Sequence, residues 1–321
     1  MNRRNLRYDI VILLLVATLG SSMCLAVQES QESKTADTDS VENADNVLNK
    51  VAFEISDANN ISVPAMLNGV DEVRLMFHTA NSEVVLTAAA AAKSESVKFE
   101  KSISMSSWGG KTEGKISESN SLRIGSQQWD NIRIFQDQLS GPGTDGKFGP
   151  DRFEGNVFEI DVDANTLRVY SSLPEKVNQY EKLAVTNENG MMFIVGSIKV
   201  AGQWCENKFL IHSGYGGSVL LDDEFVESHG LKSKLKTLSE SELRDSGGNV
   251  LKTKKIELPM LKVGSFELQN VPTQVFDGSI RKQKMSVVGG DFLKRFNIVF
   301  DSKNSCIYLK RSELFEAEFK K

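Results

Sequence analysis

The sequence has few prolines and few histidines, and each scarcity limits what the chain can be. Six prolines and 24 glycines among 321 residues argue against a fibrous or mainly disordered protein. Hydrophobic residues make up 40% of the chain, which is enough to bury one or two sizeable cores. Only three histidines are present, so a pattern formed by two of them carries weight.

The chain also lacks a stripe of basic residues. Its formal net charge is −5, and lysine and arginine are scattered rather than interleaved with aromatic residues along one segment. Proteins that bind nucleic acids present such a positive surface. The sequence therefore predicts no nucleic-acid partner, and no pattern in it indicates a cofactor.

Long hydrophobic runs are absent except near the N-terminus. Residues 10–19 form an apolar run, and the segment before it contains Arg3, Arg4 and Arg7. A run of this length suits the hydrophobic region of a signal peptide and is short for a membrane span. We therefore expect residues 1–26 to be a signal peptide and the mature protein to be exported, into a periplasm or to the outside.

Two alternatives stay open for this N-terminal segment. Cys24 would carry the acyl chain if the protein were a lipoprotein, although Met23 before it is larger than that signal normally allows. An uncleaved segment would instead act as a membrane anchor. We expect contact with a membrane only through one of these routes. Residues 27–50 are polar and acidic without an aromatic side chain, which predicts a disordered linker.

Two stretches of the chain, residues 75–86 and 209–221, share one pattern. Each begins with an apolar run fit for a buried strand, reaches a polar triplet and closes with a second apolar run. The triplets are His-Thr-Ala, which starts at His78, and His-Ser-Gly, which starts at His212. A histidine buried by chance has no reason to recur in this way. We therefore expect His78 and His212 to form the centre of the functional site.

Three further pairs of segments repeat in the same order, and all separations lie between 134 and 140 residues. One large unit copied once excludes a solenoid, which needs several short repeats. The composition of the segments is that of short strands and turns, with a short helix expected at residues 88–92. The sequence thus predicts two equivalent all-β lobes, residues 51–175 and 176–321. The repeated pairs are 124–132 with 263–271, 148–151 with 288–291, and 158–161 with 298–301.

Equivalent lobes can bury matching faces against each other across a pseudo-twofold axis. The loop that follows the first apolar strand of each lobe then meets its twin near that axis. This arrangement predicts that the rings of His78 and His212 lie face to face.

The doubled pattern resembles the pepsin and retropepsin-like aspartic protease family. The resemblance is carried by an apolar strand, a triplet x-Ser/Thr-Gly, a later apolar pair with glycine at residues 287–289, and closing strands at residues 292–301. It is strong in the second half and moderate in the first, where Lys147 takes the place of an apolar residue. The resemblance implies a bilobal fold of two retropepsin-like β-barrels with short helices.

In that family, the first residue of each triplet is an aspartate, and the two aspartates share a proton and activate water. Here those places are taken by His78 and His212. Thr79 and Ser213 keep the hydroxyl that, in the family, bonds across the axis to hold the two loops together. Gly214 is kept, whereas the first triplet ends in alanine instead of glycine.

Two imidazoles cannot copy the chemistry of two aspartates. An aspartate pair carries one proton and one negative charge, whereas imidazoles near pH 7 are neutral or positive. The leading prediction is thus an inactive protease-like protein that binds an extended peptide or a protein in the cleft between its lobes. The alternatives are a peptidase or other hydrolase that uses the histidine pair, and a metal site with His78 and His212 as two ligands, for which no third ligand is evident.

Three smaller expectations accompany this interpretation. If the two rings are close, protonating both costs repulsion, so stability should fall as the pH drops through about 6. Cys205 and Cys306 lie in predicted strands, either as buried thiols or as a disulfide. Trp108 lies at the tip of a predicted hairpin, either as a flap over the cleft or as an ordinary aromatic residue.

Overall fold

The computed structural model describes residues 46–107, 110–276 and 283–319. The predicted signal peptide, Cys24 and Trp108 lie outside these ranges, as does the linker up to residue 45. Among the described residues, none of the helices is both long and apolar enough to span a lipid bilayer.

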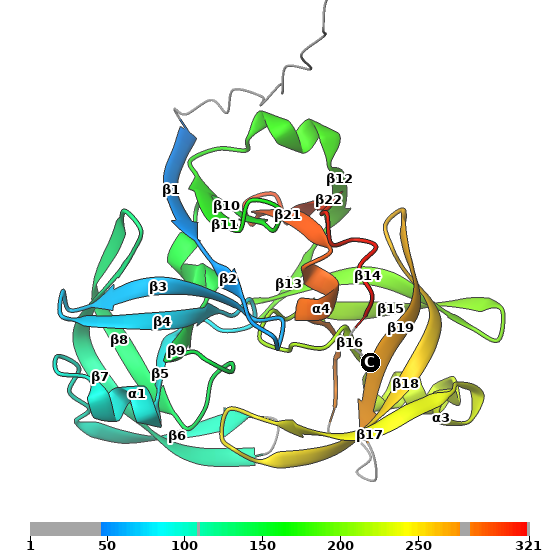
Figure 1. Ribbon diagram of the computed structural model, residues 1–321, viewed down its shortest axis with the longest axis horizontal. Helices are drawn as coiled ribbons and strands as arrows, with labels where there is room; N and C mark the ends of the chain where they lie inside the picture. The colour runs from blue at the N-terminus through cyan, green and yellow to red at the C-terminus, as the bar shows by residue number, and fades with distance from the viewer. Residues whose placement is uncertain (1–45, 108–109, 277–282, 320–321) are drawn as a thin grey trace, which may run out of the picture. The chain divides into compact units, whose positions relative to one another are not determined.

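The first lobe is an eight-stranded sheet that closes on itself (Figure 1). Its strand order is β2-β3-β4-β9-β5-β8-β7-β6, and an added pairing of β3 with β7 joins six of these strands into a ring. Alternating burial along β3 places the apolar side chains inside this ring. The strands are β2 (Glu54–Ile55), β3 (Ile61–Leu67), β4 (Asp71–Phe77), β5 (Val84–Thr87), β6 (Lys101–Ser107), β7 (Gly110–Ile124), β8 (Gln127–Asp137) and β9 (Gly146–Phe148).

The second lobe repeats this order strand for strand. Its sheet runs β13-β14-β15-β20-β16-β19-β18-β17, and a pairing of β14 with β18 again closes six strands into a ring. The duplicated all-β architecture predicted from the sequence is confirmed. The strands are β13 (Thr186–Glu188), β14 (Met191–Val200), β15 (Gln203–Ile211), β16 (Val219–Leu220), β17 (Thr237–Arg244), β18 (Val250–Val263), β19 (Phe266–Phe276) and β20 (Ser286–Val288).

A third sheet of six strands takes three strands from each half, in the order β1-β11-β10-β21-β22-β12. The strands are β1 (Val47–Ala52), β10 (Val157–Asp161), β11 (Thr166–Tyr170), β12 (Glu181–Ala184), β21 (Phe296–Asp301) and β22 (Cys306–Arg311). At its centre β10 and β21 run antiparallel, and the rings of Phe158 and Phe300 stack with centroids 4.4 Å apart. This pair places the pseudo-twofold axis of the molecule between the two lobes.

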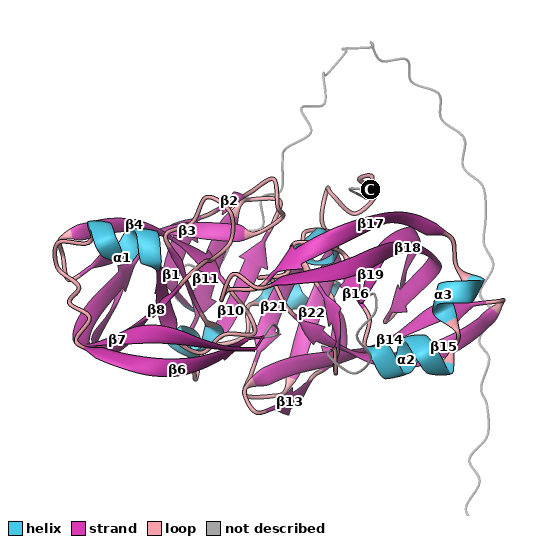
Figure 2. Cartoon of the chain, turned by 90° about the horizontal axis from the view of Figure 1, so that it is seen from below, coloured by secondary structure: helices cyan, strands magenta, loops and turns pink. Residues whose placement is uncertain are grey.

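The helices are short and lie outside the sheets (Figure 2). The expected helix after Thr87 is present, and the Thr87 hydroxyl accepts a hydrogen bond from the Ala90 N–H at its start. Asp222 caps the second helix in the same way through the Phe225 N–H. The α-helices are α1 (Ala88–Lys93), α2 (Asp223–Ser228), α3 (Leu231–Lys234) and α4 (Gly290–Leu293), and the 3-10 helices are η2 (Pro150–Phe153) and η3 (Glu175–Gln179).

The N-terminal boundary differs from the sequence-based expectation. We predicted that residues 27–50 form a disordered linker, but residues 47–50 lie in β1 and pair with β11. The strand was not predicted because Asn49, a polar residue, occupies a position where a strand pattern normally has a buried apolar residue. Its side chain is buried and bonded, donating to the Ile124 carbonyl and accepting from the Ser126 N–H.

The two cysteines of the described residues are free thiols. Cys205 lies in β15 and is partly buried, whereas Cys306 lies in β22 and is buried. Of the two predicted states, the structure has the thiols and not the disulfide.

Candidate functional site

Thr79 and Ser213 hold the two histidine loops together. The Thr79 hydroxyl donates to the Ile211 carbonyl (2.7 Å) and accepts from the Ser213 N–H (3.0 Å). The Ser213 hydroxyl does the reverse, donating to the Phe77 carbonyl (2.6 Å) and accepting from the Thr79 N–H (3.0 Å). Both side chains are buried. These four bonds are symmetric and tie the end of β4 to the end of β15 across the axis.

These four hydrogen bonds bring His78 and His212 together. Their ring centroids lie 4.5 Å apart with an angle of 55° between the ring planes. Each histidine N–H donates to the neighbouring parallel strand, that of His78 to the Phe148 carbonyl (2.9 Å) and that of His212 to the Val288 carbonyl (3.0 Å). The repeated segments 148–151 and 288–291 thus have the same role in both lobes, because the first residue of each accepts the backbone N–H of the histidine.

Backbone N–H groups fix the protonation pattern of the two rings. His78 Nδ1 accepts from the Ala80 N–H (3.2 Å), and His212 Nδ1 accepts from the Tyr215 N–H (3.0 Å). An imidazole nitrogen that accepts a hydrogen bond carries no proton, so these bonds assign the neutral tautomer with the proton on Nε2. Protonating either ring would turn Nδ1 into a donor and break its bond to the backbone.

Both histidine side chains are partly exposed, but their loss of hydration inside the protein still favours the neutral form. Burial lowers the pKa of His78 well below its usual value, and the charges of His212 and Lys147 lower it further. The pKa of His212 falls to about 4, mainly through burial and with a contribution from Lys147. We expected repulsion between two protonated rings to destabilise the protein in acid, but loss of hydration is the first cause of the lowered pKa values. The lowered pKa values and the backbone bonds to Nδ1 both favour neutral rings at physiological pH.

Gly214 leaves space for one of the rings. A β-carbon at this position would overlap the His78 ring, so glycine is required for the ring to lie where it does. Ala80 takes the equivalent place in the first lobe and packs against a cluster of apolar side chains that includes Tyr215 and Leu220. The two loops therefore differ at this position, with Ala80 in the first lobe and Gly214 in the second. The site is asymmetric, because the His78 ring lies against Gly214 of the second loop.

Lys147 is a buried cation beside the histidines. It lies on β9, directly before the residue whose carbonyl holds His78, and its Nζ lies 3.7 Å from a carboxylate oxygen of the buried Asp137. The sequence showed Lys147 as a departure from an apolar pattern but gave no sign of its partner. Asp137 ends β8, ten residues earlier, and no spacing rule links the two positions.

Side chains from the loop between β2 and β3 complete the site from the opposite lobe. Asn60 Nδ2 donates to the Ser213 carbonyl (3.0 Å), and Asn59 Nδ2 donates to the Gly216 carbonyl (2.8 Å). These bonds hold the His212 loop in place. Sequence analysis missed both residues, because asparagine in a turn is usually explained by the turn itself.

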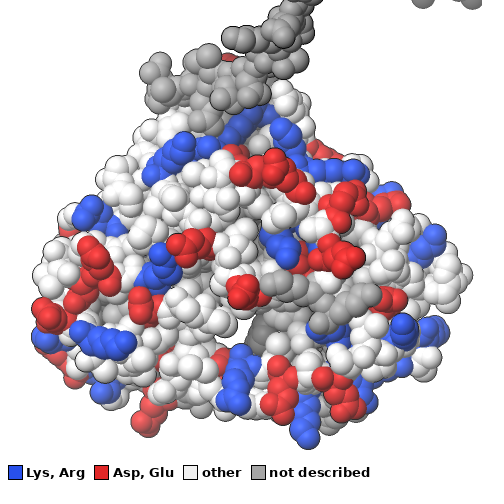
Figure 3. All heavy atoms as spheres, in the orientation of Figure 1, with Lys and Arg blue, Asp and Glu red and all other residues white. Residues whose placement is uncertain are grey.

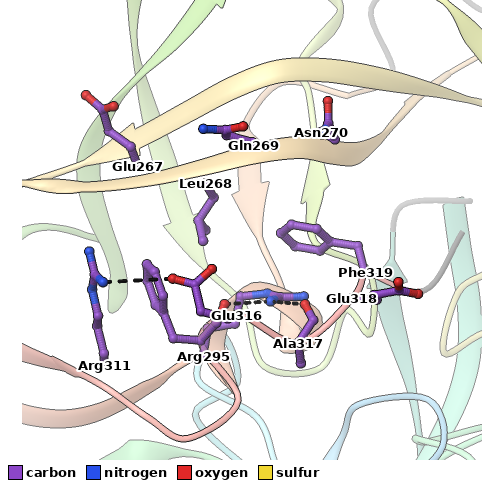
Figure 4. Close-up of a pocket in the computed structure, with 11 residues that line it drawn as sticks. Glu267, Leu268, Gln269, Asn270, Arg295, Arg311, Glu316, Ala317, Glu318 and Phe319 are labelled. Carbon is purple, nitrogen blue, oxygen red and sulfur yellow. Dashed lines mark hydrogen bonds and ion pairs between the residues drawn. The ribbon is translucent and has the colours of Figure 1, made fainter.

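The space-filling view shows an opening between the two lobes, above the place where the ribbon in the same orientation has β6 and β17 (Figure 3). A cavity of about 500 Å³ lies elsewhere, beneath the C-terminal segment (Figure 4). There the Arg295 guanidinium donates to the carbonyls of Phe315 (2.9 Å) and Ala317 (2.6 Å) and so anchors the chain end. None of the residues that line this cavity belongs to a histidine loop.

A metal site at the pair is not favoured by the described residues. They contain no cluster of three or more histidine, cysteine or acidic side chains placed to hold an ion. In addition, the unprotonated nitrogen of each ring is engaged by a backbone N–H, so binding a metal would require both rings to change tautomer.

The four hydrogen bonds of Thr79 and Ser213 between the histidine loops lead to a prediction for the stability of the protein. Replacing Thr79 with valine keeps the shape but removes a hydroxyl that makes two buried bonds, leaving the Ser213 N–H and the Ile211 carbonyl unpaired. We expect Thr79→Val to lower the free energy of unfolding by about 2–4 kcal/mol, measured by urea titration. The exposed Thr186→Val in β13 is the matched control, for which we expect a change below about 0.5 kcal/mol. Equal losses of unfolding free energy in the two variants would contradict a stabilising role of the Thr79 hydroxyl between the loops.

No protein-family model matches the chain, and neither does any curated protein. Among solved structures, the crystal structure of an aspartic proteinase from Irpex lacteus matches with a TM-score of 0.54 at 14% sequence identity. The match covers 84% of this chain and 99% of that chain. At this identity the likeness shows the fold alone. The chain therefore has the bilobal pepsin-like fold that its sequence predicts.

Proposed function

We propose that this protein is an exported, catalytically inactive relative of aspartic proteases that binds an extended peptide or an unfolded protein segment between its lobes. In this proposal His78 and His212 take the places of the two catalytic aspartates. The observation that carries the proposal is the state of the two rings: each Nδ1 accepts from a backbone N–H, and the pKa of each ring lies below its usual value.

Hydrolysis by an aspartic protease requires a group that takes a proton from water and a group that gives one. A neutral imidazole has one basic nitrogen, and in both rings this nitrogen is committed to the backbone. The described parts of the two loops contain no carboxylate beside the rings that could replace the missing negative charge. The same reasoning weighs against the alternative hydrolase that would use the histidine pair as a base.

Binding of an extended peptide does not require the negative charge that an aspartate pair would supply. The pepsin-like fold retains two lobes with an opening between them. Among the described strands, β6 and β17 are edge strands, each with a strand neighbour on one side only. Extended peptides bind such edges by adding a strand, in which the main chain supplies most of the hydrogen bonds. This mode favours unfolded segments of any sequence that can reach the cleft.

Fluorescently labelled casein, an unfolded protein, tests the proposal. We expect the purified mature chain to bind it in fluorescence anisotropy, with a dissociation constant in the micromolar range, and to leave it intact on gels from pH 3 to pH 8. The control is the same chain with Gly214→Leu, whose side chain would displace the His78 ring and obstruct the site. Casein cleavage that disappears in His212→Asn would overturn the proposal, and so would an absence of binding.

A further inference from the structure

The two rings of the histidine pair present hydrogen-bond donors to a ligand. Each Nδ1 accepts a backbone N–H, from Ala80 (3.2 Å) at His78 and from Tyr215 (3.0 Å) at His212. The proton of each neutral ring is then on Nε2, and a protonated ring nitrogen can only donate. The ring centroids lie 4.5 Å apart, so one ligand group can lie close to both rings. The chemistry of this pair is the reverse of that of an ionised carboxylate, which only accepts.

The donors of the pair can be reached by a ligand, because both histidines are partly exposed. The His78 Nε2 atom lies against Gly214, where a β-carbon would overlap it. Since glycine has no side chain, no side chain of this residue covers the nitrogen. The loop residues 78–82 and 212–218 contain no aspartate or glutamate, so the loops themselves supply no carboxylate as an acceptor.

The state of the rings favours a negatively charged ligand group. A neutral carbonyl and an ionised carboxylate can both accept from Nε2–H, but hydrogen bonds to an ionised acceptor are roughly twice as strong. Lys147 adds positive charge on the same side of the preference. It directly precedes Phe148, whose carbonyl accepts the His78 N–H (2.9 Å), and after burial its charge is a further cause of the lowered pKa of both rings.

We propose that the histidine pair is a carboxylate-binding site, which holds an acidic group of the bound peptide through the Nε2–H groups of His78 and His212. This group is either the carboxylate at the C-terminus of the peptide or the side chain of an aspartate or glutamate within it. The inference rests on the proposed function, because it names the chemistry that the cleft selects in a bound peptide. No bond is broken at the pair, so the peptide is released unchanged.

Three peptides of one sequence test the site and separate the two sources of the carboxylate. Each has about eight residues and an uncharged fluorophore at its N-terminus. The first has a central glutamine and a free C-terminal carboxylate, the second a central glutamate and a C-terminal amide, and the third a central glutamine and a C-terminal amide. At pH 7 we expect the first or the second to bind at least about tenfold more tightly than the third in fluorescence anisotropy.

The outcomes of this experiment separate the carboxylate site from the proposed function. The peptide that binds more tightly identifies the source of the carboxylate. Equal affinities of all three peptides would overturn the carboxylate site and leave the proposed function in place. If none of the three binds, the carboxylate site is overturned as well, and the casein experiment decides separately on the proposed function.

A variant with His78→Asp and His212→Asp reverses the chemistry of the pair. An aspartate oxygen can accept the same backbone N–H, but the aspartate pair is negatively charged at pH 7 and repels a carboxylate. We expect this variant to lose the preference for the carboxylate peptides. The control is Asn187→Asp with Gln203→Glu, which adds two negative charges at exposed positions and should keep the preference. An equal loss in this control would overturn the site.

The wild-type chain provides a second readout that needs no variant. In a nitrogen–proton correlation spectrum of the imidazoles, we expect the tighter-binding carboxylate peptide to shift the Nε2 signals of His78 and His212 more than the amide peptide does. The signals of His229, which lies outside the loops, should not change. Equal shifts with the two peptides at saturation would contradict a carboxylate held by the pair.

Discussion

A variant with His78→Asp and His212→Asp is expected to hydrolyse casein between about pH 4 and pH 5, at least about a hundredfold faster than the wild-type chain. The scaffold that an aspartate pair needs is present, since Thr79 and Ser213 hold the loops together. A carboxylate oxygen at either position would take the place of Nδ1 and accept the same N–H, from Ala80 or from Tyr215. Two close carboxylates would then share one proton, which gives the acid and the base that the imidazoles lack. Proton transfer of this kind contributes roughly 10²–10⁴ in rate.

The single variants are the internal controls of this experiment. With one aspartate and one histidine the pair cannot share a proton between like groups, so we expect each single variant to stay near the wild-type rate. The variant with asparagine at both positions keeps the acceptors without the charge and should be inactive. A folded double-aspartate variant without activity would contradict the proposal that the two histidines stand where the family has its catalytic pair.

The stability of the wild-type chain is expected to fall steeply between about pH 6.5 and pH 4. The unfolded chain binds protons at its histidines near pH 6.5, whereas the folded chain keeps His212 neutral down to about pH 4. As the pH falls through this window, the unfolded state takes up protons first and is favoured. The shift at His212 corresponds to a loss on the order of 3 kcal/mol, and His78 adds to it in the same direction. Below about pH 4 the contribution of His212 levels off.

Substitution by asparagine separates this effect from the titration of carboxylates. The variant with His78→Asn and His212→Asn keeps an acceptor for the backbone N–H groups but has no group at these two positions that titrates between pH 4 and pH 7. Urea titrations at pH 7, 5.5 and 4 should show a smaller loss of unfolding free energy in this variant than in the wild-type chain, by on the order of 3 kcal/mol. His229→Asn, outside the site, is the control and should behave as the wild type. Parallel losses in all three proteins would contradict a histidine pair that is held neutral in the folded chain.

The duplicated fold could be predicted because local signals and long-range repetition agree. The recurrence of histidine loops and of the segments at 148–151 and 288–291 was visible in the letters alone, and their equivalence appears in the matching strand orders of the two lobes. Helix starts at Thr87 and Asp222 were predictable for a local reason, since each side chain caps the residue three positions later.

The parts of the site that sequence analysis missed are contacts between distant positions. Asn60 lies 153 residues from Ser213, and the bond between them depends on the packing of the lobes rather than on a pattern near either residue. The same holds for the backbone bond from Leu139 to Ser246, which involves no side chain and so leaves no trace in the residue types. The sequence showed Lys147 as a polar residue in an apolar pattern, but only the structure showed that its ion-pair partner is Asp137.

Nuclear magnetic resonance of the imidazole nitrogens can measure the state of the two rings, and the chain has only three histidines to assign. A long-range nitrogen–proton correlation reports both the charge and the tautomer of each ring. From pH 8 to pH 5, we expect His78 and His212 to stay neutral with the proton on Nε2 and to show contacts between their rings. Protonation of either ring near pH 6.5, or a proton on Nδ1 at neutral pH, would contradict it.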